Sequence, residues 1–66
     1  MTNDELAAIA RQKKNDFIAA RSCGANFDEL KRLASEYGEA IAAWHAQRFP
    51  GKRFIKPSVS YLIRAL

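Results

Sequence analysis

The chain has 66 residues, of which 48% are hydrophobic and 27% charged, a composition that is ordinary for one small globular domain and excludes a disordered chain. Cys23 is the only cysteine and His45 the only histidine, which excludes an internal disulfide and a zinc site with the usual ligands. No apolar stretch approaches the roughly 20 residues that span a bilayer, and the acidic N-terminus is unlike a signal peptide. We therefore expect a cytoplasmic protein without a membrane partner.

The net charge is +4, and the excess positive charge lies in the last third of the chain. Up to His45, six basic residues are interspersed with seven acidic ones. From Ala46 onward the chain carries five basic residues and no acidic residue. This asymmetry is typical of proteins that bind a polyanion, although a solubilising surface has the same composition.

The first predicted helix covers residues 3–22. Thr2 and Glu5 have the spacing of a capping box, in which the hydroxyl accepts from a backbone N–H and the carboxylate reaches back. Gly24 is a natural C-terminal stop, because glycine readily takes the left-handed conformation that ends many helices. Between these signals the apolar residues fall close to one helical face: Leu6, Ile9, Ala10, Phe17 and Ile18.

The second predicted helix covers residues 27–48. Asn26 is its expected N-cap, and Glu29 follows three positions later. Gly38 lies inside the pattern and weakens a helix by about 1 kcal/mol relative to Ala. The apolar stripe keeps its phase through Gly38, which favours one long helix over two short ones, with a kink at Gly38 as the intermediate case. The stripe advances in steps of three and four residues through Phe27, Leu30, Ala34, Tyr37, Ile41 and Trp44.

A turn and a third helix complete the chain. Pro50 disfavours helical geometry at Phe49, and the Pro-Gly pair marks a turn. Residues 52–56 are expected to form a short extended connection. Pro57 fits the first turn of a new helix, where its missing N–H removes no hydrogen bond, so we expect a helix over 57–66. The apolar face of this helix consists of Val59, Leu62, Ile63 and Leu66.

These elements predict an all-α fold, a small three-helix bundle in which residues 1–66 form a single domain and the last two helices form a helix-turn-helix-like pair. At this size folding buries only about 60% of the surface, so a dimer or a partner would add stability. The expected core consists of Phe17, Leu30, Tyr37, Ile41, Trp44, Val59, Leu62 and Ile63.

Nothing in the sequence indicates catalysis, and we expect no enzyme activity, no cofactor and no metal. The chain has no nucleophile paired with a base, no P-loop and no Gly-x-Ser-x-Gly pattern. His45 is expected to be a half-exposed helix residue, and Cys23 a small residue at a helix end.

The segment from Glu39 to Leu66 is predicted to have the order helix, turn, helix. In DNA-binding pairs of this type the second helix lies in the major groove. That helix must turn apolar residues inward and short polar or basic residues outward. The candidates for the outward side are Ser58, Ser60, Tyr61 and Arg64.

Residues 54–63 resemble the recognition-helix segment of helix-turn-helix DNA-binding domains of the lactose-repressor and centromere-binding-protein types. Those segments often read as a hydrophobic residue, then Ser-x-x-Thr-Val-Ser-Arg, then two aliphatic residues. The resemblance is carried by Phe54 at the hydrophobic turn position, by Val59 and Ser60, and by the aliphatic pair Leu62 and Ile63.

The chain departs from this pattern in three places. Tyr61 replaces the usual Arg, and Pro57 takes a position that is commonly polar. The connection 49–56 is longer than the usual tight turn, which matters because turn length fixes the angle between the two helices.

The resemblance implies duplex DNA, rather than RNA, as the partner. Lys52, Arg53 and Lys56 would contact phosphates, and serine hydroxyls could also bind phosphate oxygens. Tyr61 and Arg64 would lie nearest the base edges. The complete predicted nucleic-acid site consists of Arg48, Lys52, Arg53, Lys56, Ser58, Ser60, Tyr61 and Arg64.

A protein partner with an acidic patch is the alternative, because small helical proteins also act as accessory or inhibitory subunits that dock one helical face on a larger protein. A homodimer on two DNA half-sites is compatible with the first hypothesis. The salt dependence of binding distinguishes the DNA partner from the protein partner. Phosphate contacts weaken steeply with ionic strength, whereas apolar docking does not.

Overall fold

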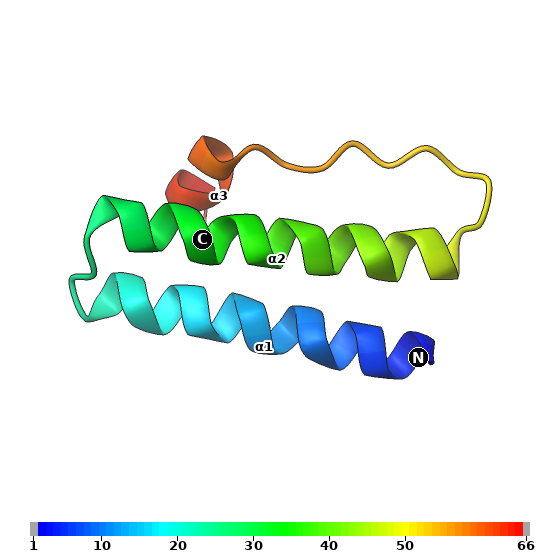
Figure 1. Ribbon diagram of the computed structural model, residues 1–66, viewed down its shortest axis with the longest axis horizontal. Coiled ribbons are helices and arrows are strands. Elements are labelled where there is room, and N and C mark those ends of the chain that lie inside the picture. The colour runs from blue at the N-terminus through cyan, green and yellow to red at the C-terminus, as the bar shows by residue number, and fades with distance from the viewer. Residues whose placement is uncertain (1, 66) are drawn as a thin grey trace.

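The computed structural model describes residues 2–65 as three α-helices, which are α1 (Asn3–Ser22), α2 (Phe27–Arg48) and α3 (Val59–Ala65). The expectation of an all-α, three-helix fold is thereby confirmed. α1 and α2 lie side by side and antiparallel, and α3 packs on α2 near the α1–α2 turn (Figure 1). The expected place of Leu66 in the third helix lies outside the described residues.

α1 begins and ends at local signals that the sequence displays. The backbone N–H of Glu5 donates to Oγ1 of Thr2 at 3.1 Å, and the N–H of Thr2 donates to Oε1 of Glu5 at 3.4 Å, so the capping box is formed. At the other end, Gly24 has φ 78° and the N–H of Ala25 donates to the carbonyl of Ala20 at 3.0 Å. This left-handed glycine with a bond back into the last turn is the usual way for a helix to stop.

α2 is one helix that continues through Gly38. Asn26 is its N-cap, and its Oδ1 accepts from the backbone N–H of Glu29 at 2.8 Å. Gly38 is buried, as are Leu30 and Ala34 on the same helix. The apolar stripe therefore faces the rest of the molecule over the first half of α2.

α3 begins at Val59, so the expected start at Pro57 is wrong. Ser58 is the residue that caps the helix: its Oγ accepts from the N–H of Tyr61 at 3.1 Å, and its carbonyl accepts from the N–H of Leu62 at 3.0 Å. A serine hydroxyl satisfies a free N–H of the first turn, which Pro57 cannot do. Pro57 is therefore the last residue of the extended connection.

The core lies at one end of the helical hairpin, where α3 covers it. Its buried members come from all three helices and are Phe17, Leu30, Ala34 and Leu62. Partly buried residues packed against them include Tyr37, Val59 and Ile63. Ile41 and Trp44 are only partly buried and do not belong to this cluster, so placing them in the core was wrong. α3 is too short to reach the end of the hairpin where they lie.

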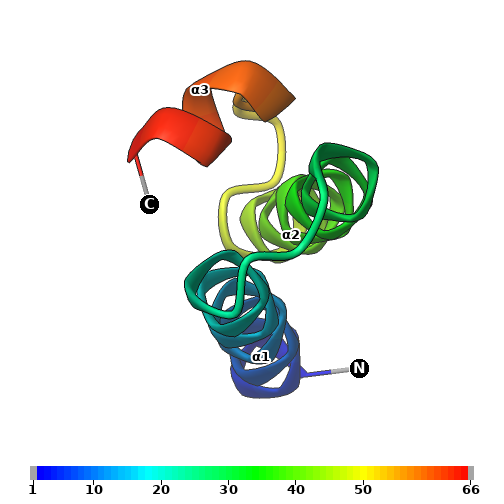
Figure 2. The same ribbon diagram turned by 90° about the vertical axis from the view of Figure 1, so that its left-hand side faces the viewer.

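Ten residues, 49–58, join α2 to α3 and run back alongside α2 (Figure 1). α3 consequently lies over the first half of α2, where Leu62 joins Leu30 and Ala34 in the core. Seen end-on, α3 is displaced to one side of the α1–α2 pair (Figure 2). The connection is thus much longer than the turn of three or four residues that joins a helix-turn-helix pair.

Candidate nucleic-acid interface

The turn after α2 reverses the chain and exposes basic side chains. The N–H of Lys52 donates to the carbonyl of Phe49 at 3.1 Å, and Gly51 has φ 82°. Proline followed by a glycine of positive φ is the arrangement of a type II turn, so Pro50 and Gly51 both serve the reversal. Arg48 at the end of α2 and Lys52 after the turn are exposed.

Aromatic rings hold the start of the connection against the end of α2. His45 stacks on Phe54, with ring centroids 4.6 Å apart and planes inclined by 22°, and it lies 5.0 Å from the ring of Phe49. Trp44 meets Phe49 edge-on at 6.0 Å. His45 is partly buried, and its Nδ1 has no hydrogen-bond partner in the described part of the chain. His45 acts here as a packing surface that fixes the position of Phe54.

Lys56 is held by α2 in the middle of the connection. Its ammonium group forms an ion pair with Glu39, and its aliphatic stem passes over Gly38. The predicted role of Lys56 was phosphate binding, but Glu39 already compensates its charge in the free protein. Within residues 2–65, no ion pair involves the other four predicted cations, which are Arg48, Lys52, Arg53 and Arg64.

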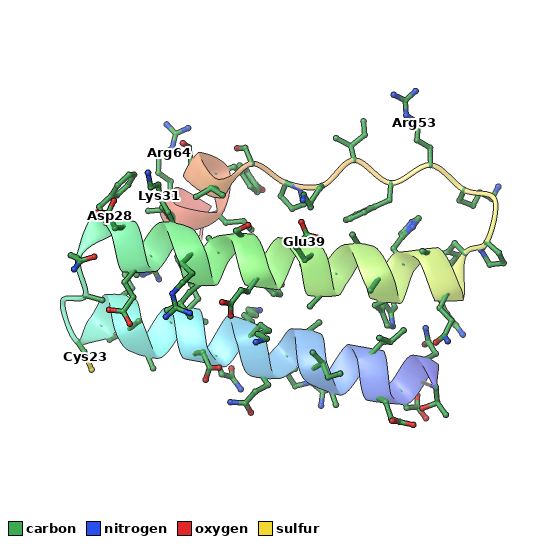
Figure 3. The ribbon with its side chains drawn as sticks, in the orientation of Figure 1. Cys23, Asp28, Lys31, Glu39, Arg53 and Arg64 are labelled. Atoms are coloured by element: carbon green, nitrogen blue, oxygen red, sulfur yellow. The ribbon has the colours of Figure 1, made fainter. Side chains whose placement is uncertain are left out.

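Residues between the turn and α3 alternate between the two sides of the connection. Phe54 and Lys56 contact α2, whereas Ile55 is 79% exposed. Arg53 points away from the helices, into solvent (Figure 3). The side chain of Arg53 is therefore available to a partner.

α3 turns its polar side outward, as the sequence predicted. Leu62 is buried, while Ser60 and Tyr61 are exposed, Tyr61 by 59%. Arg64 is exposed and projects away from the body of the molecule (Figure 3). Ser58 is exposed as well, although its Oγ already serves as the cap of α3.

Arg21 of α1 fixes the end of α3, a role that the sequence did not reveal. Its Nη1 donates to the carbonyl of Ile63 at 3.2 Å, and its guanidinium lies 5.7 Å from the ring centroid of Phe17. A cation at the C-terminal carbonyls of a helix is favourable because these groups carry partial negative charge. The two partners are 42 positions apart, so no local pattern could have indicated the contact.

A shallow hollow of about 390 Å³ lies between α3 and the start of α2, lined by Phe27, Ser60, Ile63 and Arg64. Phe27 is 58% exposed, and the ammonium group of Lys31 lies 5.4 Å from its ring centroid. The helical spacing of apolar residues places Phe27 in the apolar stripe and does not indicate that its ring is exposed. Its exposure reflects its place in the first turn of α2, beyond the part that α3 covers.

The predicted site residues form a strip rather than a compact cluster. We define the acid-free strip as the connection 49–58 together with α3, because this stretch contains no Asp or Glu. Arg53 and Arg64 lie towards its two ends and project to the same side of the molecule (Figure 3). Arg48 and Lys52 lie beside the turn at one end of the strip.

Comparison with protein-family models, with curated proteins and with solved structures finds no match to this chain. The helices within residues 2–65 are too short or too polar to cross a membrane. In the same part of the chain, no three His, Cys, Asp or Glu side chains come together as metal ligands could.

Proposed function

We propose that the chain binds duplex DNA through the acid-free strip, chiefly by contacts to the phosphate backbone. The observation that supports the proposal is the placement of Arg53 and Arg64. Both project to the same side from the two ends of the strip, and neither is held in an ion pair within residues 2–65.

A row of separated cations suits a linear polyanion better than a single small anion. A pocket for one phosphate group needs cations that converge on a point, whereas the extended connection keeps Arg53 and Arg64 apart. Duplex DNA carries one negative charge per about 1.7 Å of its axis. The molecule is 37 Å long, so a strip along it can meet several phosphates at once.

Side-chain chemistry suggests different roles along the strip. Arg48, Lys52 and Arg53 are suited to phosphates, which fix the position of a protein on the duplex without reading its sequence. Tyr61 and Arg64 are exposed on α3, and a guanidinium can bind N7 and O6 of guanine together. Duplex DNA is favoured over duplex RNA because the major groove of RNA is too deep and narrow for side chains to read.

Fluorescence anisotropy with a labelled duplex tests the proposal over a range of salt concentrations. Phosphate contacts by Arg48, Lys52 and Arg53 would give a slope of log K against log salt of about −2.7. The double variant Arg53→Ala, Arg64→Ala should reduce the slope to about −1.8, because one of the three phosphate contacts is lost. Its binding should weaken further because the contact of Arg64 with a base edge is also lost.

The matched control is Arg11→Ala, Lys14→Ala, which removes the same charge from α1, outside the strip. This variant should bind almost as tightly as the parent, with the parent's salt slope. Equal losses in the two double variants would contradict the assigned site, since only net charge would then matter. Circular dichroism of each variant confirms that the fold is retained.

A protein partner with an acidic patch is a second candidate, and the hollow beside α3 favours it. An exposed aromatic ring next to Arg64 and Lys31 would suit an acidic segment that also carries an apolar side chain. Phe27→Ala would then abolish a complex that survives high salt, while leaving DNA affinity unchanged. Loss of DNA binding in Phe27→Ala would instead place Phe27 in the DNA site.

A further inference from the structure

Residues 53–56 form an extended segment whose backbone is unpaired. Within residues 2–65, no hydrogen bond joins the N–H or carbonyl groups of these four residues to another part of the chain. The turn at Pro50-Gly51 precedes the segment, and Pro57, which has no N–H, follows it. A row of unpaired donors and acceptors is what an edge strand offers to another strand.

The side chains of this segment alternate as those of a β-strand do. Phe54 and Lys56 face α2, where they contact His45 and Glu39. Arg53 faces away from α2 (Figure 3). Ile55 has the largest exposed fraction of any large hydrophobic residue described, 79%. The two contacts with α2 hold the segment extended in advance, so pairing would cost little additional conformational entropy.

We propose that residues 53–55 pair antiparallel with the same residues of a second copy of this chain. The symmetric register places the two Phe54 residues opposite each other. Each Arg53 then lies opposite Ile55 of the second copy. The pair forms a two-stranded ribbon whose outer face carries two arginines and two isoleucines.

The residues of the segment favour the symmetric register and a second copy of the chain as the partner strand. A shift that placed Ile55 opposite Ile55 would bring Arg53 opposite Pro57, which cannot donate to a ladder. In the symmetric register no two like charges are opposite each other on the outer face. On the inner face Lys52 meets Lys56 of the second copy, and the repulsion is reduced because Glu39 neutralises Lys56. This register therefore places no two uncompensated like charges directly opposite each other.

Strand pairing would also create a surface for DNA, and this part of the inference rests on the proposed function. The major groove of B-DNA admits a two-stranded ribbon as well as an α-helix. The ribbon would gather the Arg53 side chains of both copies on one face, and the two α3 helices would flank it. Pairing of the strands does not itself depend on DNA.

Cross-linking tests the register directly, in a Cys23→Ser background that removes the exposed native thiol. Arg53→Cys and Ile55→Cys proteins are mixed in equal amounts and oxidised. Directly opposite residues are within disulfide reach, and diagonal ones are farther apart. We expect the mixed 53–55 dimer to exceed either homodimer several-fold. A random distribution of the three dimers would overturn the register.

Sedimentation equilibrium of the parent protein tests the dimer, with chemically synthesised chains N-methylated at Phe54 or at Ile55 as the matched pair. These two N–H groups point to opposite edges of a strand, so one methylation should abolish the dimer and the other should not. A parent that stays monomeric at every concentration overturns the inference, as does a dimer that survives both methylations. If the parent binds DNA as a monomer, the proposed function is retained and the strand pairing is wrong. If the parent dimerises without binding DNA, the strand pairing is retained and the proposed function is wrong.

Discussion

The side chain of Lys56 lies across α2 at Gly38. A Cβ atom on Gly38 would be 3.4 Å from Cγ and 3.6 Å from Cδ of Lys56, and the Lys56 ammonium group reaches Glu39, the next residue of α2. Glycine weakens the interior of a helix by about 1 kcal/mol relative to alanine. A methyl group would make ordinary contact with Lys56 at these distances, whereas a larger side chain would have to displace it.

Substitution of Gly38 should have effects of opposite sign depending on side-chain size. Gly38→Ala adds a methyl group at ordinary contact distance and removes the flexibility of glycine, so it should raise the free energy of unfolding by up to about 1 kcal/mol. Gly38→Leu must displace Lys56 and should lower it by about 1–3 kcal/mol. Urea denaturation measures both. Ala43→Leu at an exposed position of the same helix is the control, with an expected change within about 0.5 kcal/mol.

Phe17 should matter more to stability than Trp44, although tryptophan is larger. Phe17 is fully buried between the helices, so Phe17→Ala should lower the free energy of unfolding by about 3–5 kcal/mol, which threatens a domain this small. Trp44 is only partly buried and outside the core, so Trp44→Ala should cost less. Urea denaturation of the two variants compares them. A larger loss for Trp44→Ala would show that the aromatic contacts at the end of α2 stabilise the fold more than the core does.

The sequence predicts those parts of the fold that depend on neighbouring residues. The caps at Thr2 and Asn26 and the stop at Gly24 involve groups within five positions of these residues. They set both ends of α1 and the start of α2, and the turn at Pro50 sets the end of α2. The path of the chain after Arg48 depends instead on contacts between distant residues. Two contacts hold the connection against α2: Phe54 stacks on His45, and the stem of Lys56 passes over Gly38. A helical periodicity of three or four residues does not reveal such contacts.

The candidate site also has some features that the sequence predicts and others that it does not. Helical spacing alone predicts that Leu62 is buried while Tyr61 and Arg64 are exposed on α3. The neutralisation of Lys56 by Glu39 and the hold of Arg21 on Ile63 could not be predicted, because each joins residues from different elements. Charge counting therefore identified the basic segment without showing which of its cations are unpaired.

Glu36 should make the fold sensitive to acid. Its carboxylate accepts from Lys13 of α1 at 3.2 Å and from Arg32 at 3.0 Å, and the hydrogen bond and charge of Lys13, followed by Arg32, lower the pKa of Glu36 below 4.5. A lowered pKa in the folded state means that the stabilisation is present above the ordinary pKa and is lost as the pH falls through the lowered one. Urea midpoints at neutral and acidic pH should converge for Glu36→Gln and the parent as the pH falls. A constant difference between them would contradict this role.

Arg21 should hold α3 against the hairpin. Arg21→Ala removes the bond to the carbonyl of Ile63, and a bond of this kind from a charged donor contributes about 1.5–3 kcal/mol when it is shielded from water. Hydrogen exchange of the α3 amides measures the loss, which should appear as faster exchange in residues 61–65 with little change in α1. Arg11→Ala, an exposed arginine of the same helix, is the control. Faster exchange throughout the chain would mean that Arg21 supports the whole fold rather than α3.

Phe54 should control how firmly the connection lies against α2. Phe54→Ala removes the ring that stacks on His45 and leaves only Lys56 to hold the segment, so the connection should leave α2 more often. Trypsin cleaves after exposed, mobile lysines and arginines, which makes cleavage after Lys52 and Arg53 the readout. Ile55→Ala changes the next residue, whose side chain is 79% exposed, and should be cut at the rate of the parent. If Phe54→Ala is cut no faster than Ile55→Ala, the ion pair with Glu39 is the anchor that matters, and the combination of Phe54→Ala with Lys56→Ala should then release the segment.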